Sequence, residues 1–177
     1  RNVRTYRAQG DIRAAIVATD DVSLWPMAQF MSKDMATVIW QTDNEVTPLI
    51  ILSSVYCDIN ETVNSKMLND LCNYASQKQI PLFIGADSNS HSTLWGCPKT
   101  NPRGLQFEDL IYNYQLNVEN IGKKPTFVAG VGSSIIDITI TNIHSTDLMK
   151  LWRVEKDNFG SDHQLISFDL DMEIEEP

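Results

Sequence analysis

The sequence has few of the residues and runs that mark several large classes of protein. Its three cysteines, Cys57, Cys72 and Cys97, fit neither a disulfide framework nor a zinc site of CxxC type. We therefore expect reduced thiols in a protein that works inside the cell. No apolar run approaches the roughly 20 residues that a membrane helix requires, since even the stretch 46–57 is interrupted by Pro48. The sequence predicts no membrane partner.

Basic residues are also scarce, with 14 Lys and Arg against 23 Asp and Glu and a net charge of −9. This acidity argues against broad binding to phosphates, because Lys and Arg usually supply affinity for nucleic acid. The excess charge is uneven. Residues 161–177 carry six acids and no Lys or Arg, whereas residues 123–156 carry five bases against three acids. The composition therefore permits a local basic surface, and we expect residues 171–177 to form an acidic tail.

The hydrophobic content, 42% of 177 residues, suffices for a core, so we expect residues 1–177 to form one folded domain. Asn60 is a candidate cap for a first helix that carries Val63 on its apolar side, and a second helical pattern follows Pro102. A Gly-containing turn suggests a hairpin over 127–138. Short β-branched segments outnumber the helices and indicate an α/β (α+β) fold with much antiparallel sheet. They lie at 12–19, 36–41, 49–57, 80–86, 126–128, 134–141, 151–155 and 164–170.

Polar residues with chemical potential follow one of these strands directly. The apolar run 80–86 ends in Asp87-Ser88-Asn89-Ser90-His91, which places a carboxylate, an amide and an imidazole at one strand end. Sites of α/β proteins are built at such ends, although Asp, Asn and Ser also form ordinary turns. Asp87 and Asn89 are candidates for positioning a water molecule. His91 is a candidate phosphate contact, and a role in capping its loop is an equal alternative.

Two further acids, Asp137 and Asp162, lie in the last third of the sequence together with His163. Asp137 is embedded among isoleucines, and strict alternation puts it on the face opposite Ile138. A buried carboxylate needs a hydrogen-bond partner, and the imidazole of His163 is our candidate. Asp162 offers a hard oxygen ligand for Mg²⁺, which usually takes only one or two carboxylates. A metal ligand, a pair that positions water and an Asp–His dyad are the parts that phosphodiester hydrolysis requires.

The ordered series of motifs resembles the endonuclease/exonuclease/phosphatase superfamily. Residues 84–96 are similar to its Gly-x-Asp-x-Asn motif, and Trp95-Gly96 resembles the branch formed by the apurinic-like endonuclease domains of non-LTR (LINE-type) retrotransposons. Segments 124–127, 134–139 and 161–163 follow in the order of that branch. The resemblance assigns catalytic roles to Asp87, Asn89, Asp137, His163 and Tyr56, a metal-binding role to Asp162, and contacts with DNA phosphates to Thr126 and Ser161.

The resemblance implies a fold, a reaction and partners. The fold is a four-layer sandwich of two facing mixed β-sheets flanked by helices, here with the N-terminal strands missing. The reaction is Mg²⁺-dependent nicking of double-stranded DNA, with Mn²⁺ as a substitute ion, that leaves a 3′ hydroxyl to prime reverse transcription. It implies an intracellular protein that acts in the nucleus.

The superfamily's early Asn and metal-binding Glu have no counterpart among the eleven residues before Ile12. We therefore expect a piece of a longer polyprotein, whose partners include a separate N-terminal fragment or the reverse transcriptase domain. The alternatives are an abasic-site nuclease, another phosphoesterase of the superfamily, or a truncated, non-catalytic remnant that only binds nucleic acid or protein.

Overall fold

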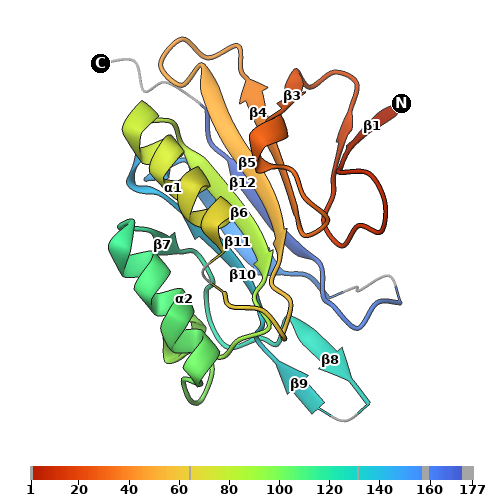
Figure 1. The fold of residues 1–177 in the computed structure, drawn as a ribbon, viewed down its shortest axis with the longest axis vertical. Coiled ribbons are helices and arrows are strands. Elements are labelled where there is room, and N and C mark those ends of the chain that lie inside the picture. Colours follow the sequence, from red (N-terminus) through yellow and green to blue (C-terminus); the bar gives the residue numbers. More distant parts are fainter. Residues whose placement is uncertain (1, 64, 131, 157–159, 173–177) are drawn as a thin grey trace.

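The computed structural model describes residues 2–63, 65–130, 132–156 and 160–172, and Figure 1 shows the order of the elements. Two α-helices accompany twelve strands in the described residues. The helices are α1 (Lys66–Lys78) and α2 (Pro102–Asn113). The strands are β1 (Val3–Tyr6), β2 (Ile16–Thr19), β3 (Leu24–Pro26), β4 (Met35–Gln41), β5 (Leu49–Tyr56), β6 (Leu82–Asp87), β7 (Asn117–Val118), β8 (Phe127–Ala129), β9 (Gly132–Ser134), β10 (Asp137–Thr141), β11 (Met149–Val154) and β12 (Ile166–Leu170).

The centre of the molecule is a six-stranded sheet in the order β3-β4-β5-β6-β10-β7. Only β5 and β6 are parallel neighbours; the other pairs in this sheet are antiparallel. A parallel pair needs a crossover connection, and α1 provides it between β5 and β6. The carboxyl ends of β5 and β6 therefore meet the amino end of β10 at one edge of the sheet.

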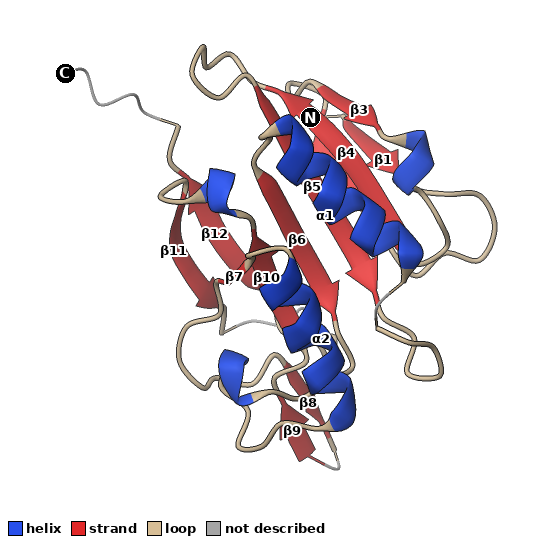
Figure 2. Ribbon diagram, turned by 60° about the vertical axis from the view of Figure 1, so that its left-hand side comes forward, coloured by secondary structure: helices blue, strands red, loops and turns tan. Residues whose placement is uncertain are grey.

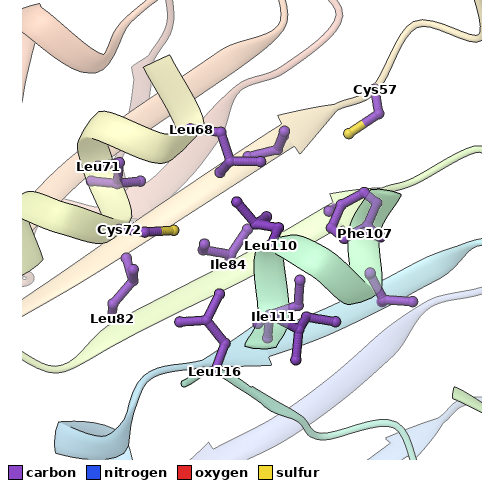
Figure 3. Close-up of a cluster of buried hydrophobic side chains, with 14 of the residues drawn as sticks. Cys57, Leu68, Leu71, Cys72, Leu82, Ile84, Phe107, Leu110, Ile111 and Leu116 are labelled. Carbon is purple, nitrogen blue, oxygen red and sulfur yellow. The ribbon is translucent and has the colours of Figure 1, made fainter. Parts of the chain in front are cut away.

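One face of this sheet is covered by both α-helices, as Figure 2 shows. Ile84 of β6 and Ile138 of β10 lie on this face of the sheet. They pack there against Leu68 and Leu71 of α1 and Phe107 of α2. Figure 3 shows the side chains of α1 and α2 meeting over β5 and β6. These residues are at most 1% exposed, so burial of apolar area is the main stabilising contribution on this face.

The opposite face of the sheet carries two separate strand pairs, β1–β2 and β11–β12. The ring of Phe168 on β12 stacks on Phe83 with centroids 6.3 Å apart, and Trp152 Nε1 on β11 donates to Thr139 Oγ1 at 2.9 Å. The α/β class with a mixed sheet is thus confirmed. The described residues form three layers, because their two α-helices lie on one side and strand pairs occupy the other.

Several helices and strands begin or end at other residues than predicted, and hydrogen bonds explain why. The first helix begins at Lys66, so Val63 lies before it and not within it. Ser65 Oγ accepts the N–H of Leu68, whereas the N–H of Asn60 is used in a turn with Asp58. The predicted cap at Asn60 is therefore wrong. The second helix is confirmed, with Asn101 as its cap.

Two of the predicted strands are shorter in the structure. The strand expected from residue 12 starts at Ile16, because the N–H groups of Arg13 and Ala14 donate to Lys33 O. The strand predicted at 134–141 is divided at Ile136. Its N–H donates to Thr126 Oγ1 and its carbonyl accepts from Ser88 N. The hairpin is thereby restricted to β8 and β9.

The thiols are reduced, as the sequence predicts. All three cysteines are free and buried, and burial raises the pKa of Cys57 and of Cys72 to about 12. These two thiols are therefore protonated and unreactive at neutral pH. Neither α1 nor α2, the α-helices of the described residues, is long and apolar enough to span a membrane.

Candidate active site

Three polar side chains form one row across the sheet. Tyr56 at the end of β5 pairs with Asp87 at the end of β6, and Asp87 pairs with Asp137 at the start of β10. Side chains at paired positions lie on the same face of a sheet. The preceding row, Val55, Ala86 and Ile138, is buried in the helix-covered core, so alternation directs Tyr56, Asp87 and Asp137 to the opposite face.

A cavity of about 590 Å³ opens over this row. The next residues on the same face, Ser54, Gly85 and Thr139, also line it. A Cβ atom added at Gly85 would meet nothing within 4 Å, so the glycine leaves open space beside the two carboxylates. The volume of the cavity lies within the range of cavities that bind small molecules.

His163 reaches the row because its loop is fixed to β8. The N–H of Val128 donates to Asp162 O at 2.8 Å, and the N–H of Gln164 donates to Thr126 O at 2.7 Å. His163 Nδ1 lies 3.0 Å from both carboxylate oxygens of Asp137. Nδ1 is thus the nitrogen that donates to Asp137, which turns Nε2 toward the cavity. The predicted pairing of Asp137 with His163 is present in the structure.

The imidazole also faces the second carboxylate of the row. His163 Nε2 lies 3.9 Å from Asp87 Oδ2, beyond a direct hydrogen bond. Burial raises the pKa of Asp87 and of Asp137, while the charge of His163 opposes the rise in both. The nearby Asp87 carboxylate raises the pKa of Asp137 further. The site therefore gains from an added positive charge, such as a protonated imidazole or a cation.

The donor atoms of this group suit a metal ion. Asp87, Asp137 and His163 each offer one ligand atom, and these atoms lie within 4.8 Å of one another. Asp162, the residue predicted to bind the metal, is not a member of this group among the described residues. Its side chain is exposed, and its backbone carbonyl holds β8. The metal-binding role of Asp162 stays a prediction.

Asn89 occupies a tight turn directly after β6. Its φ of 44° lies in the left-handed region, where Asn is among the better tolerated residues. Its Nδ2 donates to Cys57 O at 3.2 Å, and its N–H donates to Asp87 Oδ1 at 3.3 Å. Asn89 therefore ties the end of β6 to the end of β5 beside the two carboxylates.

The structure gives Thr126 a role that differs from the predicted contact with a phosphate. Its side chain is 0% exposed, and its Oγ1 accepts the N–H groups of Ile136 and Asp137 at 3.1 and 2.9 Å. A buried oxygen with two partners is not available to a DNA phosphate, so the predicted phosphate contact of Thr126 is wrong. Its hydroxyl instead fixes the start of β10 and stabilises the Asp137 carboxylate.

The other two predicted phosphate contacts lie apart from each other. Ser161 is exposed beside His163, and its Oγ accepts the N–H of that residue at 3.1 Å. His91 is exposed and lines a second cavity, and its backbone N–H donates to Asn101 Oδ1. Both roles stay predictions.

Sequence reasoning missed a charged cluster on the same rim. The guanidinium of Arg13 lies 4.4 Å from the centre of the Tyr56 ring and donates to Asp34 at 2.5 and 2.7 Å. It also donates to Asp58 at 2.5 Å. The sequence contains one indication of this cluster, because Asp58 follows the strand that ends at Tyr56. Its partner Arg13 is 45 residues away in the sequence, so no local pattern reveals the pair.

Arg103 on α2 is a second residue that the sequence did not reveal. Its guanidinium donates to Asn89 O at 3.1 Å and to Glu61 O at 2.6 Å. It reaches three further carbonyl groups of the same two loops, those of Cys57, Ile59 and Ser88, at 3.3 to 3.5 Å. Arg103 thus holds together the segments that follow Tyr56 and Asp87.

Comparisons with known proteins agree with this geometry. The sequence profile of a family described as endonuclease–reverse transcriptase matches residues 50–167. No match was found among curated proteins. The structure is similar to the endonuclease domain of TRAS1, a telomere-specific non-LTR retrotransposon. The TM-score is 0.84 and the identity 28%, over 96% of this chain and 80% of that one.

More distant solved structures share the fold. A 3′–5′ exonuclease from Neisseria meningitidis has a TM-score of 0.58 and 16% identity, over 89% of this chain and 74% of that one. An AP endonuclease from Leishmania major also has a TM-score of 0.58, with 12% identity over 79% of this chain and 55% of that one. By the profile match over most of its length, this chain belongs to the endonuclease–reverse transcriptase family and has the fold of the endonuclease/exonuclease/phosphatase superfamily.

Proposed function

We propose that this chain is the Mg²⁺-dependent endonuclease domain of a retrotransposon polyprotein. It nicks double-stranded target DNA and leaves a 3′ hydroxyl that primes reverse transcription. The observation that carries the proposal is the row of Tyr56, Asp87 and Asp137 with His163 on Asp137. The likeness to a retrotransposon endonuclease domain supports the same reaction.

Each residue of the row has a task in hydrolysis. Asp87 accepts a proton from the attacking water, assisted by the side-chain oxygen of Asn89. Tyr56 donates its hydroxyl to a phosphate oxygen. The imidazolium of His163, held by Asp137, donates from Nε2 to an oxygen of the phosphorane, where negative charge develops. Ser161 contacts a further phosphate oxygen at the same rim.

The residues at the site fit a divalent cation of the Mg²⁺ class. The carboxylates of Asp87 and Asp137 are oxygen donors near one another in a partly buried setting. Mg²⁺ prefers such donors and keeps waters and substrate phosphates as its other ligands. Mn²⁺ accepts the same carboxylate oxygens and can take the place of Mg²⁺. When bound, the cation offsets charge on the phosphate, and Asp162 is our further candidate ligand.

The proposal extends to partners and to the place of action. A substrate of chromosomal DNA implies a nuclear site of action. We infer that the whole chain works as one domain beside the reverse transcriptase domain, and that an N-terminal segment of the polyprotein contributes to it. The family profile, whose description joins endonuclease and reverse transcriptase, supports this inference.

A plasmid-nicking assay with Mg²⁺ or Mn²⁺ tests the proposal. We expect conversion of supercoiled DNA to open circles, with nicks that a DNA polymerase extends from their 3′ ends. His163→Ala should reduce the rate by about 10³-fold, since general acid–base groups contribute 10²–10⁴-fold. The matched control is His144→Ala, because His144 lies in a turn after β10 and outside the cavity.

The alternatives are separate outcomes of this assay. Cleavage confined to abasic plasmid would replace the proposed reaction with that of a repair nuclease. Binding of DNA without nicking by wild type, unchanged in His163→Ala, would contradict catalysis and identify a non-catalytic remnant.

A further inference from the structure

A second cavity, called the hollow below, shares no lining residue with the cavity over the row and takes no part in the chemistry described so far. It has a volume of about 460 Å³ and opens at the base of the β8–β9 hairpin, which projects from one end of the molecule in Figure 1. Lys99, Lys123, His91, Ser133 and Ser134 supply its polar lining. None of the described residues that line it is acidic. In a chain of net charge −9, this is a local concentration of positive charge.

The two lysines of this hollow are free to receive an anion. Both are exposed, and neither pairs with a carboxylate in the described part of the chain. Lys124, the next residue after Lys123, behaves differently, because its Nζ donates to the carbonyls of Val154 and Glu155. Lys124 therefore anchors β11, while Lys123 lines the hollow.

The Trp95-Gly96 segment fixes the position of the loop that carries Lys99. Trp95 Nε1 and Cys97 Sγ both donate to Ile135 O at 3.2 Å. Gly96 has a φ of 96°, and a Cβ atom there would come within 2.7 Å of Gly122 O. Only glycine permits this approach. The contact holds the segment of Lys99 against the segment of Lys123, so the hollow is a fixed feature of the fold.

One wall of the hollow is close in sequence to Asp137 of the catalytic row. Ser134 on its wall is three residues from Asp137, a distance of at most ~10 Å along extended backbone. A strand of B-DNA carries one phosphate per roughly 3.4 Å of helix axis. A strand whose scissile phosphate lies over Asp137 can therefore present phosphates to the hollow within about three nucleotides.

We propose that this hollow binds the phosphate backbone of the target DNA strand within about three nucleotides of the nick, through Lys99 and Lys123. The inference rests on the proposed function and adds to it a phosphate subsite and the direction in which the strand leaves the catalytic cavity. The serine hydroxyls and His91 are further donors to the same phosphates. The Trp95-Gly96 segment positions the subsite without touching DNA.

Salt dependence of binding measures the proposed contacts directly. We would titrate a labelled DNA duplex with the chain in EDTA, which prevents cleavage, across a range of salt concentrations. Each neutralised phosphate contributes about −0.9 to the slope of log K against log[salt]. The double variant Lys99→Gln/Lys123→Gln should therefore reduce the magnitude of the slope by about 1.8. The control Lys78→Gln/Lys150→Gln removes the same charge at the opposite end of the sheet and should leave the slope unchanged.

A second titration locates the contact on the DNA. Neutral methylphosphonate groups placed within three nucleotides of the nick should weaken binding by wild type and cause no further loss in the double variant. An unchanged slope, or an equal effect of methylphosphonates on both proteins, would overturn this inference and leave the proposed function standing. Failure of wild type to bind duplex DNA at all would instead contradict the proposed function.

Discussion

Two groups of carboxylates on the same rim of the sheet differ in how their charge is balanced. In the first, Asp34 and Asp58 share the guanidinium of Arg13, with contacts of 2.5 to 2.7 Å. In the second, Asp137 and Asp87 share only the imidazole of His163, which is 3.0 Å from the first of them and 3.9 Å from the other. In the first group the guanidinium is at hydrogen-bond distance from both carboxylates, whereas in the second the imidazole is at that distance from Asp137 alone.

The pKa of Asp58 in the first group is shifted in the opposite direction to the pKa values of Asp87 and Asp137 in the second. The N–H of Asn60 and the guanidinium of Arg13 lower the pKa of Asp58 to about 2. Burial raises the pKa of Asp87 and of Asp137. The ionised carboxylate of Asp58 thus stabilises the fold, whereas ionisation of Asp87 and of Asp137 opposes it. Asp58 thus contributes to the structure, whereas Asp87 and Asp137, which no arginine neutralises, suit the divalent cation that we propose.

The largest effect we expect in this comparison comes from Arg103, which holds the loops of both groups. Arg103→Met removes its bonds to Asn89 O and Glu61 O and lets the two strand ends separate. Displacement of a catalytic group by about 1 Å can cost 10²-fold in rate, so we expect kcat for nicking to fall by up to about 10²-fold while the KM for DNA changes little. Steady-state kinetics on a short duplex would measure both.

Partial recovery of kcat with added guanidinium ion is the expected signature of positioning by Arg103. The matched control is Arg153→Met, which makes the same substitution at an arginine whose guanidinium pairs with Glu155 on the surface. It should keep wild-type kcat and show no response to guanidinium. If Arg103→Met retained wild-type kcat, or lost only DNA affinity, the positioning role would be refuted.

A smaller effect, on stability, should follow removal of the Asp87 carboxylate. Because the folded-state pKa of Asp87 lies above the ordinary value of 3.8, its ionisation costs stability as the pH rises through that folded pKa. Asp87→Asn should therefore gain stability relative to wild type from about pH 4 upwards. Urea unfolding of both proteins across this range would test the sign. A variant that became relatively less stable as pH rose would contradict it.

The smallest effect, also on stability, should follow removal of the Asp58 carboxylate. Its dependence on pH should be opposite in sign to that of Asp87→Asn. With a folded pKa of about 2 against an ordinary value of 3.8, the ionised group contributes stability that is lost as pH falls from about 4 to about 2. Asp58→Asn should be less stable than wild type at neutral pH, and the difference should shrink in acid. The same unfolding measurements provide the test, and a difference that grew in acid would exclude the proposed role of Arg13.

The sequence predicted those parts of the fold and site that depend on local pattern. Alternation around Asp137 placed it on the face away from Ile138, and the structure confirms this by its register with Asp87. The pairing of Asp137 with His163 was also correct, since a buried acid next to an apolar strand needs a donor. The second helix followed from its apolar period and its position after Pro102.

The sequence could not predict contacts between distant segments. Arg13 meets Asp58 across 45 residues, and Arg103 meets Cys57 across 46, so no short pattern relates them. Thr126 was misassigned for a similar reason. Its hydroxyl resembles a phosphate ligand in the sequence, but the fold buries it against the N–H groups of Ile136 and Asp137. Only the three-dimensional arrangement decides which hydroxyl remains open to a ligand.

The most direct test of the account is where a divalent cation binds. Mn²⁺ binding, followed by electron paramagnetic resonance without substrate, should be similar in wild type and Asp58→Asn, and at least about tenfold weaker in Asp87→Asn, as expected when one of few oxygen ligands is lost. This result would place the cation at the group whose charge is not balanced by arginine. Unchanged binding in Asp87→Asn, or loss of binding in Asp58→Asn, would contradict the central claim.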